Sequence, residues 1–163
     1  AQQFGADEVL YLDKKQCYYE SLAEMTGGQI YQPVLGKPVL VGGADLILEC
    51  VGSDASIDDA LHLTRAGGKV VLVGAAGVPK GVDWTPIWVH ELQVVGSYTV
   101  STEDFEDRRM RTYEVGLELM ALGKLDLSPL LTHRYELGEY REAFRTLANR
   151  SAHQAFKAVF TFG

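Results

Sequence analysis

Two short apolar runs that each end in glycine constrain the fold of this chain most. The first is Leu46–Val51, followed by Gly52, and the second is Val70–Val73, followed by Gly74. Each contains at least three consecutive apolar residues without polar alternation, and strands of this kind are buried on both faces in parallel sheets that helices cover. The sequence therefore predicts two neighbouring parallel strands at the centre of an α/β domain.

A helix-like segment connects the two runs. Ser56, with Asp59 three residues later, predicts the start of a helix, and Gly67-Gly68 predicts its end. Strand, helix and strand together occupy about thirty residues, the size of a βαβ unit. Ligands of such sheets bind beyond the carboxyl ends of the strands, so we expect a ligand near Val51–Ser53 and Gly74–Gly77.

Charge and composition narrow the classes of partner. The 163 residues carry a net charge of −7 and no long basic run, which argues against nucleic-acid and membrane-surface partners. No apolar run approaches the ~20 residues that a membrane-spanning helix needs. Cys17 and Cys50 are not a spaced pair, and Cys50 falls in a strand predicted to be buried. A reduced, cytoplasmic protein is therefore predicted.

Hydrophobic periodicity places the other elements. Strands are predicted at Glu8–Leu12, Leu92–Val95, Leu130–Tyr135 and Ala155–Phe162, and helices at Tyr19–Thr26, Trp84–His90, Thr102–Leu122 and Glu139–Arg150. Gln29–Gly43 contains two prolines and three glycines, so it is predicted to be a loop or an edge ribbon. The acids and arginines of 103–111 are interpreted as a solvated helix face rather than a phosphate site.

Six segments carry a family resemblance. In order, they are FGADEVL, GGADLILECVG, AGGKVVLVGAAG, ELQVVGSY, EAF and KAVFTF. At these spacings they resemble the cofactor domain of zinc-type medium-chain alcohol dehydrogenases, over nearly the whole chain. The resemblance implies an oxidoreductase built on a Rossmann-like, doubly wound parallel sheet with the strand order 3-2-1-4-5-6.

The resemblance also implies that this sheet is incomplete. Glu8–Leu12 matches strand 3, Leu46–Val51 strand 4, Val70–Val73 strand 5 and Leu92–Val95 strand 6, whereas strands 1 and 2 and the glycine-rich turn are absent. We therefore expect the chain to be part of a longer enzyme. Residues 1–124 are expected to form a partial dinucleotide-binding domain, and 125–163 a C-terminal segment that packs on a catalytic domain outside this chain.

The implied cofactor is NAD or NADP. Positions that line the nicotinamide half in the family match Cys50, Val51, Gly52, Ser53, Val73, Gly74, Ala75, Ser97, Tyr98 and Thr99. Lys157 matches a basic residue that faces the pyrophosphate. The alternative interpretation is that the glycines are ordinary strand-ending turns and that Lys157 is a surface lysine.

The chemistry is expected to depend on residues outside this chain. The resemblance implies a catalytic zinc held by Cys and His ligands, but His62, His90, His133 and His153 have no Cys or acid at ligand spacing. We therefore expect no catalytic residue and no metal ligand here, and no activity from this chain alone.

The expected substrate is a small alcohol or carbonyl compound, and the expected assembly is a homo-oligomer joined through the Leu92–Val95 edge. Two alternatives remain. One is a zinc-free quinone or enoyl reductase of the same superfamily. The other is a non-catalytic oligomerisation module, in which Trp84, Trp88 and the same strand edge form the contact surface.

Overall fold

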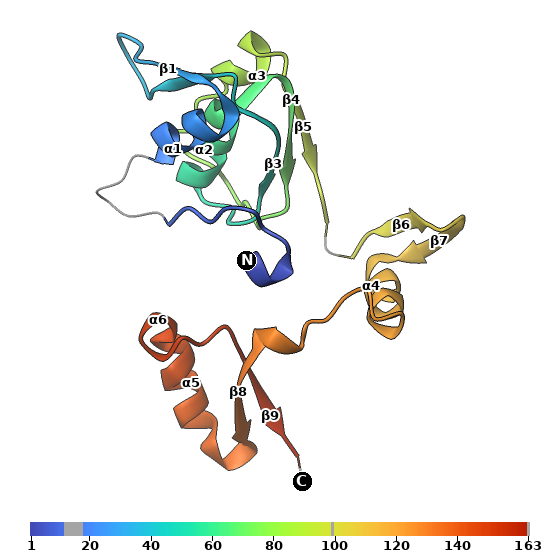
Figure 1. Cartoon of the computed structure of the whole chain (residues 1–163). Coiled ribbons are helices and arrows are strands. Elements are labelled where there is room, and N and C mark those ends of the chain that lie inside the picture. Colours follow the sequence, from blue (N-terminus) through green and yellow to red (C-terminus); the bar gives the residue numbers. More distant parts are fainter. Residues whose placement is uncertain (12–17, 99, 163) are drawn as a thin grey trace. The chain divides into compact units, whose positions relative to one another are not determined.

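The computed structural model describes residues 1–11, 18–98 and 100–162, and the chain divides into two compact units, 1–99 and 100–163 (Figure 1). The predicted functional boundary between residues 124 and 125 stays a prediction.

A three-stranded parallel sheet forms the centre of the first unit. Its strands are β3 (Ala44–Glu49), β4 (Thr64–Leu72) and β5 (Gln93–Gly96), in the order β3-β4-β5. The helix α2 (Asp54–Leu63) connects β3 to β4, and α3 (Thr85–Val89) precedes β5. The predicted α/β class with a parallel sheet is confirmed, and so is the adjacency of its three central strands.

The core of this unit lies on one face of the sheet. Ile47, Val70 and Val94 are neighbours in the strand register and point to that face. Leu61 of α2 packs against them and, like Val70, is fully buried. Burial of apolar side chains between helix and sheet contributes about 1.5–3 kcal/mol for each large residue.

A smaller cluster attaches the N-terminal elements to α2. The helix α1 (Tyr18–Thr26) and an antiparallel ribbon of β1 (Gln29–Tyr31) and β2 (Val39–Val41) meet there, and Leu40 is fully buried. Gln29–Gly43 therefore contains the edge ribbon that was one of its two predicted forms. The predicted strand Glu8–Leu12 is wrong for residues 8–11, which pair with no described strand, and Leu12 lies outside the described residues.

The α2 helix begins three residues earlier than predicted. Ser53 is the cap: its hydroxyl accepts the Ser56 N–H at 3.2 Å, and the Ser56 hydroxyl accepts the Ser53 N–H at 3.1 Å. Gly67-Gly68 does not end the helix, because β4 already begins at Thr64. The second of these glycines lies where β3 approaches β4, and a Cβ there would be 3.1 Å from the Asp45 carbonyl.

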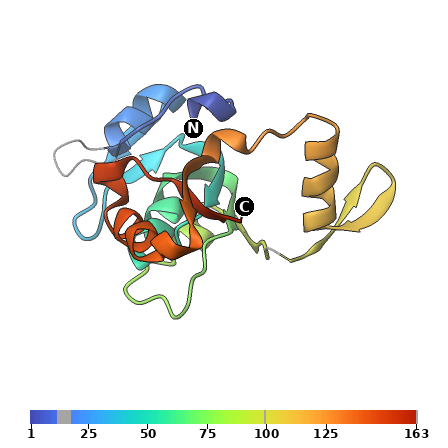
Figure 2. The ribbon, with the colours of Figure 1, turned by 90° about the horizontal axis from the view of Figure 1, so that it is seen from below.

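The second unit begins with a hairpin in the first half of the predicted helix Thr102–Leu122, and the second half of that prediction is confirmed as a helix. Strands β6 (Thr102–Phe105) and β7 (Arg108–Arg111) pair antiparallel, and α4 (Thr112–Ala121) follows beside them (Figure 2). Glu106 and Asp107 have φ values of 47° and 63° and form a two-residue turn that matches the twist of a hairpin. The charged residues interpreted as a helix face instead lie along this ladder, where Asp104 is the register partner of Arg109.

The rest of this unit is a short parallel βαβ unit. Strand β8 (Leu131–Glu136) pairs with β9 (Lys157–Thr161), and α5 (Tyr140–Ala148) and α6 (Arg150–His153) connect them. The predicted strands and helix here are confirmed, with ends that differ by one or two residues. Short 3₁₀ turns complete the structure, at Gln2–Phe4, Ser128–Leu130 and Leu137–Glu139.

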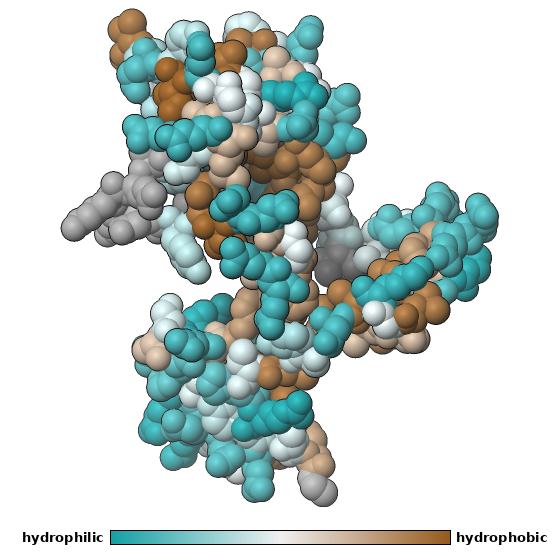
Figure 3. Space-filling view, viewed as in Figure 1, coloured by the Kyte–Doolittle hydropathy of each residue, from teal (hydrophilic) through white to brown (hydrophobic). Residues whose placement is uncertain are grey.

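The second face of the central sheet is exposed. Leu46 and Leu48 of β3 are 52% and 59% exposed. Figure 3 shows hydrophobic surface over the strands of this sheet. The prediction of burial on both faces is therefore wrong for this face. The reason is that the helices of the first unit all pack on the opposite side, around Ile47 and Val70.

Candidate functional site

Two backbone turns are packed against each other at the carboxyl edge of the sheet. The first turn, 51–53, follows β3, and the second turn, 73–76, follows β4. A Cβ on Gly52, whose φ is +79°, would lie 2.7 Å from the backbone carbon of Ala75. A Cβ on Gly74 would lie 2.3 Å from the Gly52 nitrogen, so only glycine fits at either position.

Glu49, the last residue of β3, is bonded to both turns. Its side chain accepts the N–H groups of Val51 at 2.8 Å and Gly52 at 2.9 Å, and its carbonyl accepts those of Val73 and Gly74, both at 2.8 Å. The residue is 4% exposed. Sequence reasoning missed it, although a lone acid that ends an apolar run just before a glycine turn is a recognisable signal.

The pKa of Glu49 reflects this environment. Burial alone would raise the pKa of the carboxyl, but hydrogen bonds from the Gly52 N–H, the Ser56 hydroxyl and the Val51 N–H outweigh burial and lower it. The carboxylate form therefore holds the first turn at neutral pH.

The end of β5 lies at the same edge, because the three strands are parallel and adjacent. The Ser97 N–H donates to the Leu72 carbonyl at 2.9 Å, and the Tyr98 side chain is 73% exposed. The structure thus brings together the predicted site residues of all three strand ends, except Thr99, which lies outside the described residues. Lys157 is exposed at the start of β9 in the second unit, and its N–H donates to the Thr132 hydroxyl.

Cys50 is exposed, so the prediction that it is buried is wrong. Side chains alternate along a strand, and here Glu49 points into the protein and Cys50 out of it. An open hollow of about 270 Å³ lies beside the first turn, and Leu48, Cys50 and Val51 contribute to its lining.

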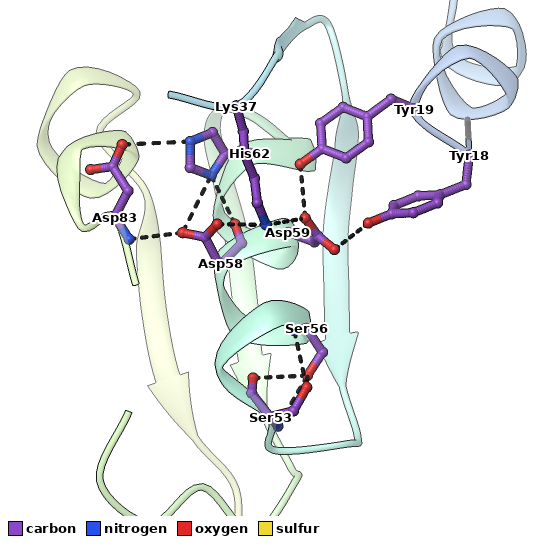
Figure 4. A network of polar contacts seen from close by, with 9 residues as sticks. All are labelled: Tyr18, Tyr19, Lys37, Ser53, Ser56, Asp58, Asp59, His62 and Asp83. Carbon is purple, nitrogen blue, oxygen red and sulfur yellow. Dashed lines mark hydrogen bonds and ion pairs between the residues drawn. The ribbon is translucent and has the colours of Figure 1, made fainter. Parts of the chain in front are cut away.

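A polar network along α2 attaches the N-terminal elements to this helix (Figure 4). The Lys37 ammonium group bonds to Asp58 at 2.7 Å and to Asp59 at 2.8 Å. The hydroxyls of Tyr18 and Tyr19 both donate to Asp59. Burial works to raise the pKa of Asp59, but hydrogen bonds from Lys37 and the two tyrosines lower it, while burial and the nearby carboxylate raise the pKa of Tyr19.

His62 connects this network to the segment after the second turn. Its Nδ1 lies 2.8 Å from the Asp58 carbonyl, which can only accept, so Nδ1 donates and carries a proton. The other nitrogen, Nε2, lies 3.6 Å from the Asp83 carboxylate, and the Asp83 N–H donates to the Asp58 carboxylate at 2.7 Å. These contacts fix the loop that leads from the second turn to α3.

The donor sets do not fit a metal ion. Within residues 1–11, 18–98 and 100–162, no three His, Cys, Asp or Glu side chains gather as metal ligands. Nor does any helix of that described portion have the length and apolar character to cross a membrane. The strand ends instead form an edge of main chain, where the two glycines let the turns pack against each other and the neighbouring residues Val51, Ser53 and Ala75 are exposed.

A parallel sheet with glycine turns packed together at its carboxyl edge defines an α/β domain of the class that binds ligands at that edge. The comparison with protein families gives the particular group: the zinc-binding dehydrogenase model matches residues 1–113. The chain belongs to the zinc-binding dehydrogenase family.

Individual relatives agree with this assignment. The chain is 32% identical to the L-idonate 5-dehydrogenase of Vitis vinifera over 163 residues, which cover 98% of this chain and 38% of that protein. It is 31% identical to the sorbitol dehydrogenase of Homo sapiens over 147 residues, which cover 90% of this chain and 35% of that protein. The chain thus spans less than two fifths of the length of these two relatives.

Solved structures show the same fold. The L-idonate 5-dehydrogenase of Escherichia coli superposes with a TM-score of 0.59 at 25% identity, over 72% of this chain and 31% of that one. A short chain alcohol dehydrogenase of E. coli CFT073, solved with NADH, gives a TM-score of 0.71 at 20% identity, over 99% of this chain and 40% of that one. At this identity the second similarity concerns the fold alone.

Proposed function

We propose that this chain is the nicotinamide-facing part of a longer NAD(P)-dependent alcohol or polyol dehydrogenase. The backbone contact between Gly52 and Gly74 carries the proposal, because it packs the two turns together at the carboxyl edge of the sheet, where ligands of this fold class bind. Family membership and the dehydrogenase relatives support it. In this proposal β3, β4 and β5 are strands 4, 5 and 6 of a doubly wound nucleotide-binding sheet.

The residues of this chain bind and orient the cofactor. The bound nicotinamide supplies the chemistry of hydride transfer. Backbone groups of the two turns and of residues 97–98 contact its carboxamide, and Gly52 and Gly74 allow the two turns to pack together at that place. For Lys157, which lies in the second unit, a role toward the pyrophosphate stays a prediction. The described residues offer no set of donors that would hold a zinc ion.

The proposal extends to a class of substrate and to a mode of assembly. A polyol or another small alcohol is the expected substrate, since L-idonate and sorbitol dehydrogenases are among the relatives. We expect a homo-oligomer joined through the Leu92–Val95 edge, because β5 is an edge strand of its sheet and Trp88 of the preceding helix is 73% exposed. A cytoplasmic location stays a prediction.

Cofactor binding to the intact protein tests the proposal. Calorimetric titration with NADH and NADPH is expected to show binding of at least one of them. Hydrogen exchange is then expected to slow at 51–53 and 73–75, with the amides of α5 as an internal control. Binding of neither cofactor, or slowed exchange confined to other segments, would overturn the assignment of this edge.

A further inference from the structure

The buried acid Glu49 has a role that the proposed function does not explain. An ionised carboxylate is costly to bury unless hydrogen bonds compensate it. Here they do, since the side chain accepts the N–H groups of Val51 and Gly52, the latter with both oxygens at 2.9 and 3.1 Å. A charged residue therefore fixes the turn at a position where the apolar pattern of the strand would predict an apolar residue.

The same residue also holds the second turn through its main chain. The Glu49 carbonyl accepts the N–H groups of Val73 and Gly74 at 2.8 Å. A Cβ on Gly74 would lie 2.8 Å from the Glu49 carboxylate and 2.3 Å from the Gly52 nitrogen. The carboxylate, the first turn and the second turn are therefore in direct contact, and a shift of the first turn must move the second.

We propose that Glu49 is a positioning residue that fixes the spacing between the two turns and thereby sets the affinity for the nicotinamide cofactor. The second half of this inference rests on the proposed function. Glu49 does not need to touch the cofactor, because it acts through the N–H groups of Val51 and Gly52 and through the contact of the two glycines.

Loss of the Glu49 charge should change the cofactor affinity in the direction opposite to that of a general charge effect. The cofactor is an anion, so removal of a nearby negative charge would by itself strengthen binding. If Glu49 positions the turns, removal of its charge weakens binding instead. A variant that loses one negative charge on α2 instead should follow the general effect.

The test compares Glu49→Gln with Asp54→Asn in the intact protein. Both changes remove one negative charge, but Asp54 is exposed in the first turn of α2. Glutamine keeps the size of the side chain and one acceptor oxygen. Its NH2 group replaces the second oxygen and cannot accept the Gly52 N–H. We expect the Kd for NADH to rise about tenfold or more in E49Q and to stay within about twofold of wild type, or fall, in D54N.

Two further measurements keep the proposal falsifiable. Without cofactor, hydrogen exchange at Val73 and Gly74 is expected to quicken in E49Q, although their own acceptor, the Glu49 carbonyl, is retained. Glu49→Asp keeps the charge but shortens the side chain, so it is expected to weaken NADH binding as E49Q does, and it serves as the test if E49Q fails to fold.

The outcomes separate this inference from the proposed function. An unchanged Kd in E49Q and E49D, or unchanged exchange at Val73 and Gly74, would overturn the positioning role. If the wild-type protein binds neither NADH nor NADPH, the proposed function and the link to affinity both fail. Exchange at Val73 and Gly74 then still decides whether Glu49 fixes the spacing of the turns.

Discussion

Replacing Gly74 by alanine perturbs the contact between the two turns directly. The added carbon would lie 2.3 Å from the Gly52 nitrogen and 2.7 Å from the Val51 carbonyl carbon. Carbon contacts are favourable from about 3.5 Å, so the turns must separate by roughly 1 Å. Overpacking of this kind costs about 1–3 kcal/mol of stability. A misplacement of about 1 Å can also reduce catalytic rates by on the order of a hundredfold.

Gly77→Ala is the matched control. It adds the same methyl group to the same loop, where no atom lies within 4 Å of the added carbon. Urea unfolding and NADH titration of the intact variants are the assays. G74A is expected to lower the urea midpoint by about 1 M and to weaken NADH binding, whereas G77A should match wild type in both. Equal stability and affinity for the two variants would refute the argument that the turns cannot separate without cost.

Three further predictions concern the rest of the described structure. Lys37→Met leaves Asp58 and Asp59 without the ammonium group between them. It should cost about 1 kcal/mol, less in high salt, as measured by urea unfolding at two ionic strengths; a salt-independent loss would contradict this cause. Because the pKa of Asp59 is lowered in the folded protein, its contribution to stability is present above about pH 4 and is lost as the pH falls through that lowered value. Asp59→Asn should therefore flatten the acid side of a plot of melting temperature against pH. A plot as steep as that of the wild type would show that Asp59 does not cause the loss of stability in acid. Asp107→Gly should raise stability by about 0.5 kcal/mol, since its φ of 63° suits glycine, and an unchanged melting temperature would show that the turn is unstrained.

The sequence predicted the elements whose periodicity is produced by packing. Val70–Val73 and Leu46–Leu48 lie in adjacent parallel strands, and the amphipathic segment after Glu139 is the helix α5. Burial of an apolar face decides such elements, and that face is visible in a single sequence. The predicted meeting of the strand ends at one edge followed from the parallel sheet.

The elements that failed depend on turn geometry or on pairing. In the first half of the predicted helix Thr102–Leu122, the acids and arginines suit a helix surface as well as a hairpin ladder. The left-handed conformations of Glu106 and Asp107 decide between them, and neither residue is a glycine that would signal such a turn. Residues 8–11 have strand-like composition, but a strand also needs a neighbour, which composition does not reveal.

Of the residues that shape the candidate site, the sequence analysis named Gly52 and Gly74 but missed Glu49. The site is built from main-chain groups, so the residues that shape it are those that leave room, Gly52 and Gly74, and the one that holds them, Glu49. Exposed neighbours such as Cys50 and Tyr98 have the side chains that attract attention, yet the geometry of the turns does not depend on them. In a site of this kind the sensitivity to substitution should follow the closeness of backbone contacts rather than the chemistry of the exposed side chains. The apparent break in the apolar pattern at Glu49 is then part of the site, because a carboxylate bonded to main-chain N–H groups fixes a turn that an apolar residue would leave free.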